Sequence, residues 1–259
     1  MTVKMIYSYS MNSRQRFTKL IESLPDARVR HVNVGAIWTA VVVDVNGVLQ
    51  GGLAATMRNP DYMLTRLPAV ERAGSLEEME AHTLAGLVTS DSHTEASIGL
   101  AAINALLPRS EHWGGLHAVD FLTRQSDGKR LAIVGHFSFV EQLRRQGLEP
   151  AVLELEPLPG DLPAEAAARV LPQSDVIVIT ATTLINNTFD GLIALCPPHA
   201  HVMLLGPSTP LSPQLFDWGL DSVAGTLVTD PLYALQMTAQ GGGTRQMKSA
   251  LRQVSLLKE

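Results

Sequence analysis

The stretch that decides the fold lies at residues 131–137 and reads Leu-Ala-Ile-Val-Gly-His-Phe. Four apolar residues that end in a glycine are typical of a buried parallel strand turning directly into a helix. Similar apolar runs follow at residues 151–155, 175–179, 201–205 and 222–228. Helical segments separate these runs, so this half of the chain is predicted to form a doubly wound, Rossmann-like parallel sheet. The third run is apolar throughout after Asp175, which favours a central position and the strand order 2-1-3-4-5.

The first half of the chain has a different pattern. Runs rich in β-branched residues lie at 29–34, 38–45 and 48–55, and Asn46-Gly47 between the last two is the strongest short signal for a β-hairpin. Helices are expected at residues 10–20, from a capping box at Ser75 and Glu78 to about Leu87, and at 93–107.

These patterns predict two domains in an α/β protein. Residues 1–120 are expected to form an α+β domain, with a three-stranded antiparallel meander and helices. Residues 121–259 are expected to form the Rossmann-like domain. The boundary is placed just before residues 125–129, whose Gln-Ser-Asp-Gly-Lys sequence indicates a turn or linker.

Composition narrows the functional classes. The chain has 259 residues, one cysteine and a formal net charge of −5. The single Cys196 excludes a disulfide framework and a cysteine-rich zinc site, and it fits a reducing compartment. The negative charge argues against a nucleic-acid partner, because such proteins neutralise phosphates with basic residues. No apolar run approaches the ~20 residues of a membrane span and no signal peptide is evident, so we expect a cytoplasmic protein with no membrane partner.

Polar residues gather where the predicted parallel strands end. The carboxyl ends of such strands share one edge of the sheet, and ligands bind there at the point where the strand order reverses. In the order 2-1-3-4-5, that point lies between the first and third strands. The residues expected to bind a small-molecule ligand are Gly135, His136, Phe137, Glu154, Glu156, Gly160, Asp161, Thr180, Thr182, Thr183, Asn186, Gly206, Pro207, Ser208 and Thr209.

Several of these residues also have a purely structural interpretation. Gly135 permits close approach by a ligand or by a packed helix, and its surroundings do not match G-x-G-x-x-G. Glu154 and Glu156 lie about 20 residues further on, where an acidic residue can hold a ribose, but either can instead cap a helix or face water. His136 can serve as a base, a metal ligand or a helix-start residue.

Two loops contain more hydrogen-bonding groups than a turn requires. Residues 180–186 carry three threonines and an asparagine, whereas a helix N-cap needs only one or two such groups. Residues 206–209 offer backbone amides and hydroxyls at the expected start of a helix, an arrangement that suits an anion.

A metal site built from side chains has few candidate ligands. Such sites need several oxygen or imidazole groups that converge. The weak candidates near the strand ends are His136, Glu156, Asp161 and Asp230. A second cluster, His112 and His117 beside acidic residues, is better explained as a solvated loop.

Several segments recur together in a known family. They are residues 134–137, 153–157, 159–163, 171–180, 182–188 and 206–210. Their order and spacing resemble a bacterial and archaeal family of undefined function named for heavy-metal chelation. Residues 37–41 and 96–105 resemble its first half, so the resemblance covers nearly the whole chain. It implies an N-terminal domain similar to the enolase N-terminal fold, a Rossmann-like domain, and a ligand cleft between them. Ser138 departs from the family pattern, which has proline there, and leaves His136 in place.

Two functions remain as alternatives. The leading one is binding of a small polar or anionic molecule in the interdomain cleft. This molecule could be a metal chelator or a metallocofactor precursor, which would give the protein a role in heavy-metal or metallocofactor handling. The other is an enzyme that holds a nucleotide-type cofactor in the Rossmann-like crevice and uses His136 as acid or base. A homodimer through residues 94–107 is a further expectation, although an alanine-rich segment of this kind is more simply core.

Overall fold

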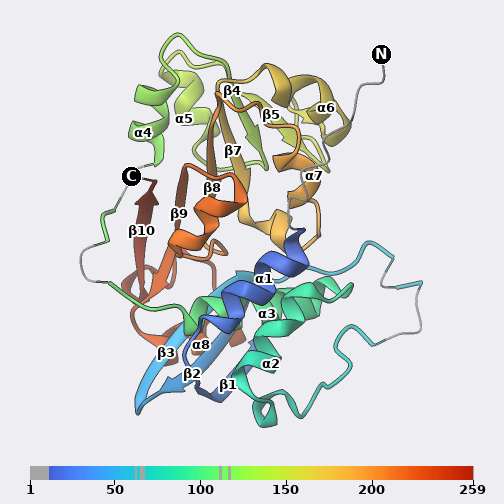
Figure 1. The fold of residues 1–259 in the computed structure, drawn as a ribbon, viewed down its shortest axis with the longest axis vertical. Helices are drawn as coiled ribbons and strands as arrows, with labels where there is room; N and C mark the ends of the chain where they lie inside the picture. The colour runs from blue at the N-terminus through green and yellow to red at the C-terminus, as the bar shows by residue number, and fades with distance from the viewer. Residues whose placement is uncertain (1–11, 62, 65–67, 111–112, 116–117, 259) are drawn as a thin grey trace, which may run out of the picture.

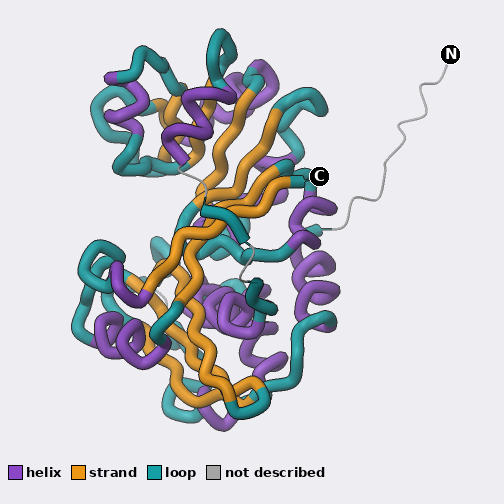
Figure 2. The backbone as a smooth tube through the Cα atoms, turned by 90° about the vertical axis from the view of Figure 1, so that its left-hand side faces the viewer, coloured by secondary structure: helices purple, strands orange, loops and turns teal. Residues whose placement is uncertain are grey.

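The computed structural model describes residues 12–61, 63–64, 68–110, 113–115 and 118–258. Within them, ten strands join into one sheet that runs through both halves of the molecule (Figures 1 and 2). The mixed α/β architecture, with an antiparallel meander followed by a parallel sheet and its helices, confirms the predicted fold class.

Three of these strands lie in the first half of the chain and the other seven in the second. They are β1 (Arg28–Val34), β2 (Trp38–Val45), β3 (Val48–Ala55), β4 (Leu131–Val134), β5 (Ala151–Glu154), β6 (Leu162–Pro163), β7 (Val176–Thr180), β8 (His201–Leu205), β9 (Ser222–Val228) and β10 (Leu251–Leu257). The α-helices are α1 (Ser13–Glu22), α2 (Ala81–Gly86), α3 (His93–Leu106), α4 (Ala118–Gln125), α5 (Val140–Arg145), α6 (Ala167–Val170), α7 (Phe189–Ile193) and α8 (Pro231–Ala239). Short 3-10 helices lie at Leu76–Glu78, Leu87–Thr89, Ala164–Ala166, Leu171–Gln173, Ala181–Leu184, Pro213–Trp218 and Lys248–Ala250.

The parallel part of the sheet has the predicted strand order. Its five main strands run β5-β4-β7-β8-β9, which is 2-1-3-4-5 in order of appearance, and all four pairings are parallel. The two-residue strand β6, which the sequence did not predict, adds a parallel edge beside β5. The strand β7 is central, and its residues from Val176 to Ile179 are buried. An entirely apolar strand is stable in this position because helices cover both faces of a parallel sheet. The chain order therefore reverses between β4 and β7, as expected.

The N-terminal meander is also as predicted. Strands β1, β2 and β3 pair in antiparallel order. Asn46 and Gly47 join β2 to β3 with φ angles of 52° and 85°. Positive φ at both central residues is what a tight two-residue hairpin turn requires, and asparagine followed by glycine adopts it at little cost.

Helices sandwich the meander from both sides. A Cβ atom added to Gly51 would meet Pro231 of α8, whereas one added to Gly52 would lie 2.1 Å from the carbonyl oxygen of Ala101 in α3. Successive residues of a strand face opposite sides of the sheet, so α3 and α8 cover opposite faces. The helix α8 belongs to the second half of the sequence, and it packs on the first.

The two halves of the sheet meet at one residue pair between β3 and β9. Gly51 pairs with Val228 there. The guanidinium of Arg109 donates hydrogen bonds to the carbonyl oxygens of both residues, at 3.0 Å and 2.7 Å, and burial lowers its pKa. One hydrophobic core also extends from the helices of the first half to β7 and β8. The division into domains at residue 120 stays a prediction.

The helix α1 links the first half of the chain to α7. Its N-terminus has a capping box between Asn12 and Gln15. Arg16 is almost buried, and its Nη1 lies 3.1 Å from Oδ1 of Asp190 in α7. Phe17 packs edge-to-face on Trp218, with 5.1 Å between ring centroids. The ion pair holds α1 beside α7, and the aromatic contact holds α1 against the 3-10 helix Pro213–Trp218.

Some predicted elements were wrong in detail. The capping box at Ser75 does not form, because the Ser75 hydroxyl donates to the carbonyl of Arg72 and the α-helix begins only at Ala81. The helical segment expected between the second and third apolar runs is broken into α6 and two 3-10 turns, with Pro172 in the second. No helix begins at residues 206–209, since the next helical segment starts at Pro213. Within the described part of the chain, no helix is long and apolar enough to cross a membrane.

Candidate functional site

A cavity of about 710 Å³ lies at the carboxyl ends of β4, β5 and β7. This is the edge of the sheet and the reversal point at which open α/β sheets bind ligands. Eight predicted positions line it: Gly135, His136, Phe137, Glu154, Thr180, Thr182, Thr183 and Asn186. The strand order therefore brings together the predicted residues after β4, Glu154 at the end of β5 and the predicted residues after β7.

The other walls of the cavity are mostly apolar. The segment around α6 contributes Ala164, Ala167 and Ala168, and α7 with the residues after it contributes Gly191, Leu192 and Leu195. Met57, in the loop after β3, brings one side chain from the first half of the chain. Sequence reasoning missed these residues, because alanines and leucines that line a cavity have the same pattern as alanines and leucines in a core.

Gly135 shapes the floor of the cavity. It follows β4 with a φ of +100°, and its N–H donates to the carbonyl of Leu153 at 2.9 Å. A Cβ atom at this position would lie 2.9 Å from both Cβ and Cγ2 of Thr180. Only glycine adopts this backbone conformation without strain and leaves room for the Thr180 side chain.

The threonines after β7 mainly hold their own loop together. The Thr183 hydroxyl donates to the carbonyl of Thr180 at 2.7 Å, and the hydroxyls of Thr180 and Thr182 lie 3.0 Å apart. Asn186 accepts hydrogen bonds from the backbone and hydroxyl of Thr188 through its Oδ1. The NH₂ group of Asn186 makes no hydrogen bond to another described residue, so it is one donor that this loop offers to an occupant.

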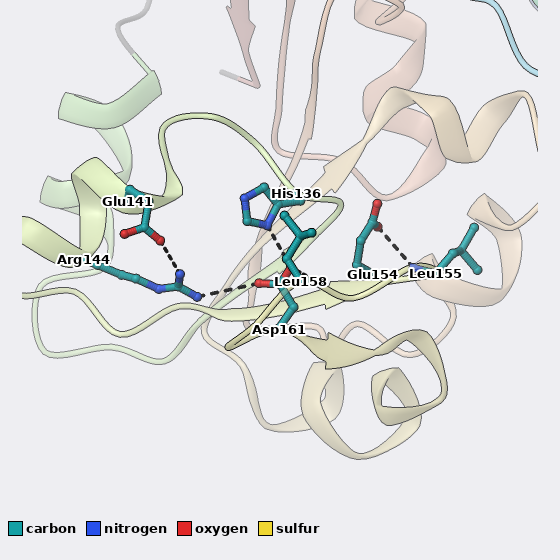
Figure 3. Close-up of polar contacts among 7 residues, drawn as sticks. All are labelled: His136, Glu141, Arg144, Glu154, Leu155, Leu158 and Asp161. Carbon is teal, nitrogen blue, oxygen red and sulfur yellow. Dashed lines mark hydrogen bonds and ion pairs between the residues drawn. The ribbon is translucent and has the colours of Figure 1, made fainter.

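His136 and Asp161 form a close pair at the edge of the cavity. Nδ1 of His136 lies 2.8 Å from Oδ2 of Asp161, and the backbone N–H of Leu158 donates to the same oxygen at 3.2 Å. Figure 3 shows Arg144 approaching the other carboxylate oxygen of Asp161, Oδ1, which lies 3.8 Å from Nη2 of Arg144. Asp161 therefore contacts His136 and does not line the cavity itself.

Glu154 is the carboxylate at the end of β5, and it lines the cavity. Burial raises its pKa, and the nearby charges of Asp161 and Glu156 act in the same direction. The N–H of Leu155 donates to Glu154, and this contact and His136 partly oppose the increase. A partly buried carboxyl of this kind holds its proton to a higher pH than an exposed one.

We expect the stability of Glu154→Gln, relative to the parent protein, to increase with pH. Because the pKa of Glu154 is raised by folding, the folded state binds more protons than the unfolded state between the two pKa values. The parent protein therefore loses stability as pH rises through that window, and glutamine does not. Melting temperatures between about pH 4 and 7 measure the effect. Glu149→Gln is the control, because Glu149 is exposed and is not among the charges that act on Glu154. A difference between Glu154→Gln and the parent that stays constant with pH would contradict the expectation.

The remaining predicted positions lie outside the cavity. Glu156 and Gly160 are exposed in the loop after β5. In residues 206–209, the Ser208 hydroxyl accepts from the N–H of Ala55 at 2.9 Å, and the Ser208 carbonyl accepts from Asn104. The group is thus part of the contact between the two halves of the molecule. Asp230 caps α8 by accepting from the N–H of Tyr233.

A metal centre made by the protein alone does not fit the described residues. They contain no group of three or more His, Cys, Asp or Glu side chains that could hold an ion. His112 and His117 lie outside the described residues. Burial raises the pKa of Cys196 to about 12, and its thiol donates to the carbonyl of Leu192, so it is a structural thiol. The cavity offers the His136 imidazole and the Glu154 carboxyl, which suit an ion with most of its ligands on a small molecule.

The fold and the cavity define a class of protein. It is an α/β protein in which a parallel sheet is joined to an antiparallel meander, and the cavity lies at the carboxyl ends of the parallel strands. The chain belongs to a family described as "Putative heavy-metal chelation". One model with that description matches residues 117–257, more than half of the chain, and a second matches residues 17–107.

Three similar proteins are described as uncharacterised or of unknown function. An uncharacterised protein of Methanocaldococcus jannaschii is 24% identical over 248 residues, which cover 92% of this chain and 93% of the relative. A crystal structure of a family member of unknown function from Desulfitobacterium hafniense is 28% identical, with a TM-score of 0.76, and covers 96% of this chain and 100% of its own. Another, from Pyrococcus horikoshii, shares the fold at 19% identity, with a TM-score of 0.80 and the same coverage of both chains.

Proposed function

We propose that the protein binds a small organic molecule that carries a metal ion, in the cavity at the ends of β4, β5 and β7. The observation that carries this proposal is the cavity itself, whose volume of about 710 Å³ lies within the usual range of roughly 300–1,000 Å³ for small-molecule sites. The family's name supports the metal, and the shortage of converging protein ligands supports a chelator that brings its own.

The lining defines the chemistry of the occupant. The lining surface is mostly apolar, with valine, methionine and phenylalanine beside the alanines and leucines, so the occupant has an apolar body. The acidic side chains of the lining are Glu154 and Glu165, and the described residues of the lining include no lysine or arginine. This favours a cationic or neutral occupant, such as a cationic metal complex, over the anionic molecule considered from the sequence.

A cavity-filling variant tests the proposal. Gly191 lines the cavity, and a Cβ atom added to it meets nothing within 4 Å, so Gly191→Phe is expected to fill the cavity without disturbing α7. The probes are Ni²⁺, Cu²⁺ and Zn²⁺ alone, bipyridine and phenanthroline alone, and their complexes. We expect a complex to raise the melting temperature of the parent protein more than either component does. At a concentration of 100 times the Kd, binding adds about 2.7 kcal/mol of stability.

The matched control is Gly86→Phe in α2, which is also a helical glycine with open space at Cβ and lies away from the cavity. Gly86→Phe should keep the response to the complex, and Gly191→Phe should lose it. Equal responses in the two variants, or no response of the parent protein to any of these complexes, would refute the proposal.

The His136–Asp161 pair favours a second candidate, an enzyme that uses His136 as acid or base. A buried carboxylate that holds one imidazole nitrogen leaves the other nitrogen available for proton transfer. Calorimetric titration with NAD, NADP and S-adenosylmethionine tests whether a nucleotide-type cofactor binds. If none binds, this candidate fails in its nucleotide-dependent form.

A further inference from the structure

The carboxylate of Asp161 is fully enclosed although it lies next to an exposed loop. Its side chain has 0% exposure, and it is held between His136 and Arg144. Oδ1 makes no hydrogen bond within the described residues, so its contact with Arg144 is an ion pair at 3.8 Å. Enclosing a carboxylate is costly unless its partners are precisely placed. The strongest of these contacts is the one to His136.

Two other histidines pair with carboxylates and provide an internal comparison. Nδ1 of His31 is 3.6 Å from Glu77, and Nε2 of His199 is 3.5 Å from Asp175. Those carboxylates are 54% and 29% exposed, whereas Asp161 is enclosed and 2.8 Å from His136. Water competes for the hydrogen-bonding groups of the His31–Glu77 and His199–Asp175 pairs, but it is excluded from the carboxylate of Asp161. His136 is therefore the described histidine whose ring is held most firmly by an acid.

The contact fixes the tautomer of His136. An ionised carboxylate only accepts hydrogen bonds, and Oδ2 already accepts one from Leu158. Nδ1 of His136 must therefore carry the hydrogen, and Nε2 carries the lone pair. The side chain of His136 is 25% exposed and belongs to the cavity lining, so an occupant can reach it.

We propose that Asp161 is a positioning residue, which holds His136 in the Nδ1–H tautomer so that Nε2 binds the divalent late transition-metal ion of the cavity's occupant. The metal part of this inference rests on the proposed function. Neutral imidazole is a common ligand of such ions, and a carboxylate behind the ring fixes its orientation and makes the free nitrogen a better donor. Asp161, predicted from the sequence as a direct ligand, acts through His136.

Nitrogen NMR of the imidazole ring tests the tautomer without any ligand. In mildly alkaline solution, where histidines are neutral, the parent protein should show the hydrogen of His136 on Nδ1. In Asp161→Asn, the amide can donate to Nδ1, so the hydrogen should shift towards Nε2. The control is Asp230→Asn, because asparagine caps a helix as well as aspartate does. This variant should leave the tautomer of His136 unchanged. A parent protein with the hydrogen on Nε2 would overturn the inference, whether or not Asp161→Asn folds.

Paramagnetic Cu²⁺, added alone, tests the metal. In the parent protein, the ring signals of His136 should broaden at a lower Cu²⁺ concentration than those of His31 and His199. Asp161→Asn should need about 10- to 100-fold more Cu²⁺ for the same broadening, the usual loss when a ligand's supporting carboxylate is removed, and Asp230→Asn should match the parent.

Broadening of His31 or His199 before His136 would overturn the assignment of His136 as the metal ligand. A failure of the proposed function is detected separately: none of the metal complexes would then raise the melting temperature of the parent protein. The tautomer measurement does not depend on that response, so the two failures can be told apart.

Discussion

Gly99→Ala should be among the most destabilising single substitutions in this protein, although alanine is the better helix former. Gly99 lies inside α3, where alanine would add about 1 kcal/mol of helix stability in an isolated helix. In the folded protein, however, the new Cβ atom would lie 2.0 Å from the backbone nitrogen of Val88. Backbone atoms cannot rotate away, so α3 must separate from the segment after α2, which costs about 3 kcal/mol or more.

Thermal unfolding measures this effect directly. A net loss of about 2 kcal/mol corresponds to a decrease of roughly 4–8 °C in melting temperature for a chain of this size. Gly86→Ala in α2 is the control, because its Cβ meets nothing within 4 Å and should leave stability unchanged or raise it. If Gly99→Ala also raised the melting temperature, this result would contradict the close contact between α3 and the backbone of Val88.

Gly135→Ala should damage stability and the cavity together. The residue has a φ of +100°, and the new methyl group would lie 2.9 Å from the Thr180 side chain. Backbone strain costs about 1–3 kcal/mol, and overpacking adds a similar amount. Any relaxation moves the end of β4 or β7, and both ends form the floor of the cavity. We therefore expect a loss of about 2–5 kcal/mol and at least tenfold weaker binding of any occupant.

Gly147→Ala separates the two causes. Gly147 has a φ of +84° and open space around its Cβ position, so this variant has the backbone strain without the clash. Chemical denaturation of both variants should give a clearly larger loss for Gly135→Ala. Equal losses would mean that the contact between Gly135 and Thr180 does not constrain the strand ends.

The parallel sheet and the meander could be predicted because their signals are local. Apolar runs of strand length, separated by helices, give the order β5-β4-β7-β8-β9 once the most apolar strand is placed at the centre. The Asn46-Gly47 hairpin follows from the two φ angles that these residues adopt easily. For the same reason, the residues after β4, Glu154 at the end of β5 and the residues after β7 could be placed at one edge of the sheet.

The errors occur where a side chain had alternative partners. The Ser208 hydroxyl could have faced a ligand or another backbone, and only the folded chain places the N–H of Ala55 beside it. Ser75 could have capped a helix, but its hydroxyl found the carbonyl of Arg72 instead. Short polar side chains form either type of hydrogen bond, so their sequence pattern does not decide between them.

By itself, the sequence determined the class of fold, the strand order, the edge of the sheet that carries the cavity and the membership of the family. These properties depend on periodicity and on residues close together in the chain. The tertiary structure alone decided that α8 covers the meander, that Arg109 joins the two halves of the sheet, and that Asp161 holds His136. Such contacts join residues far apart in the chain, and their energies depend on burial and on distances of a few tenths of an ångström, which a single sequence does not encode locally.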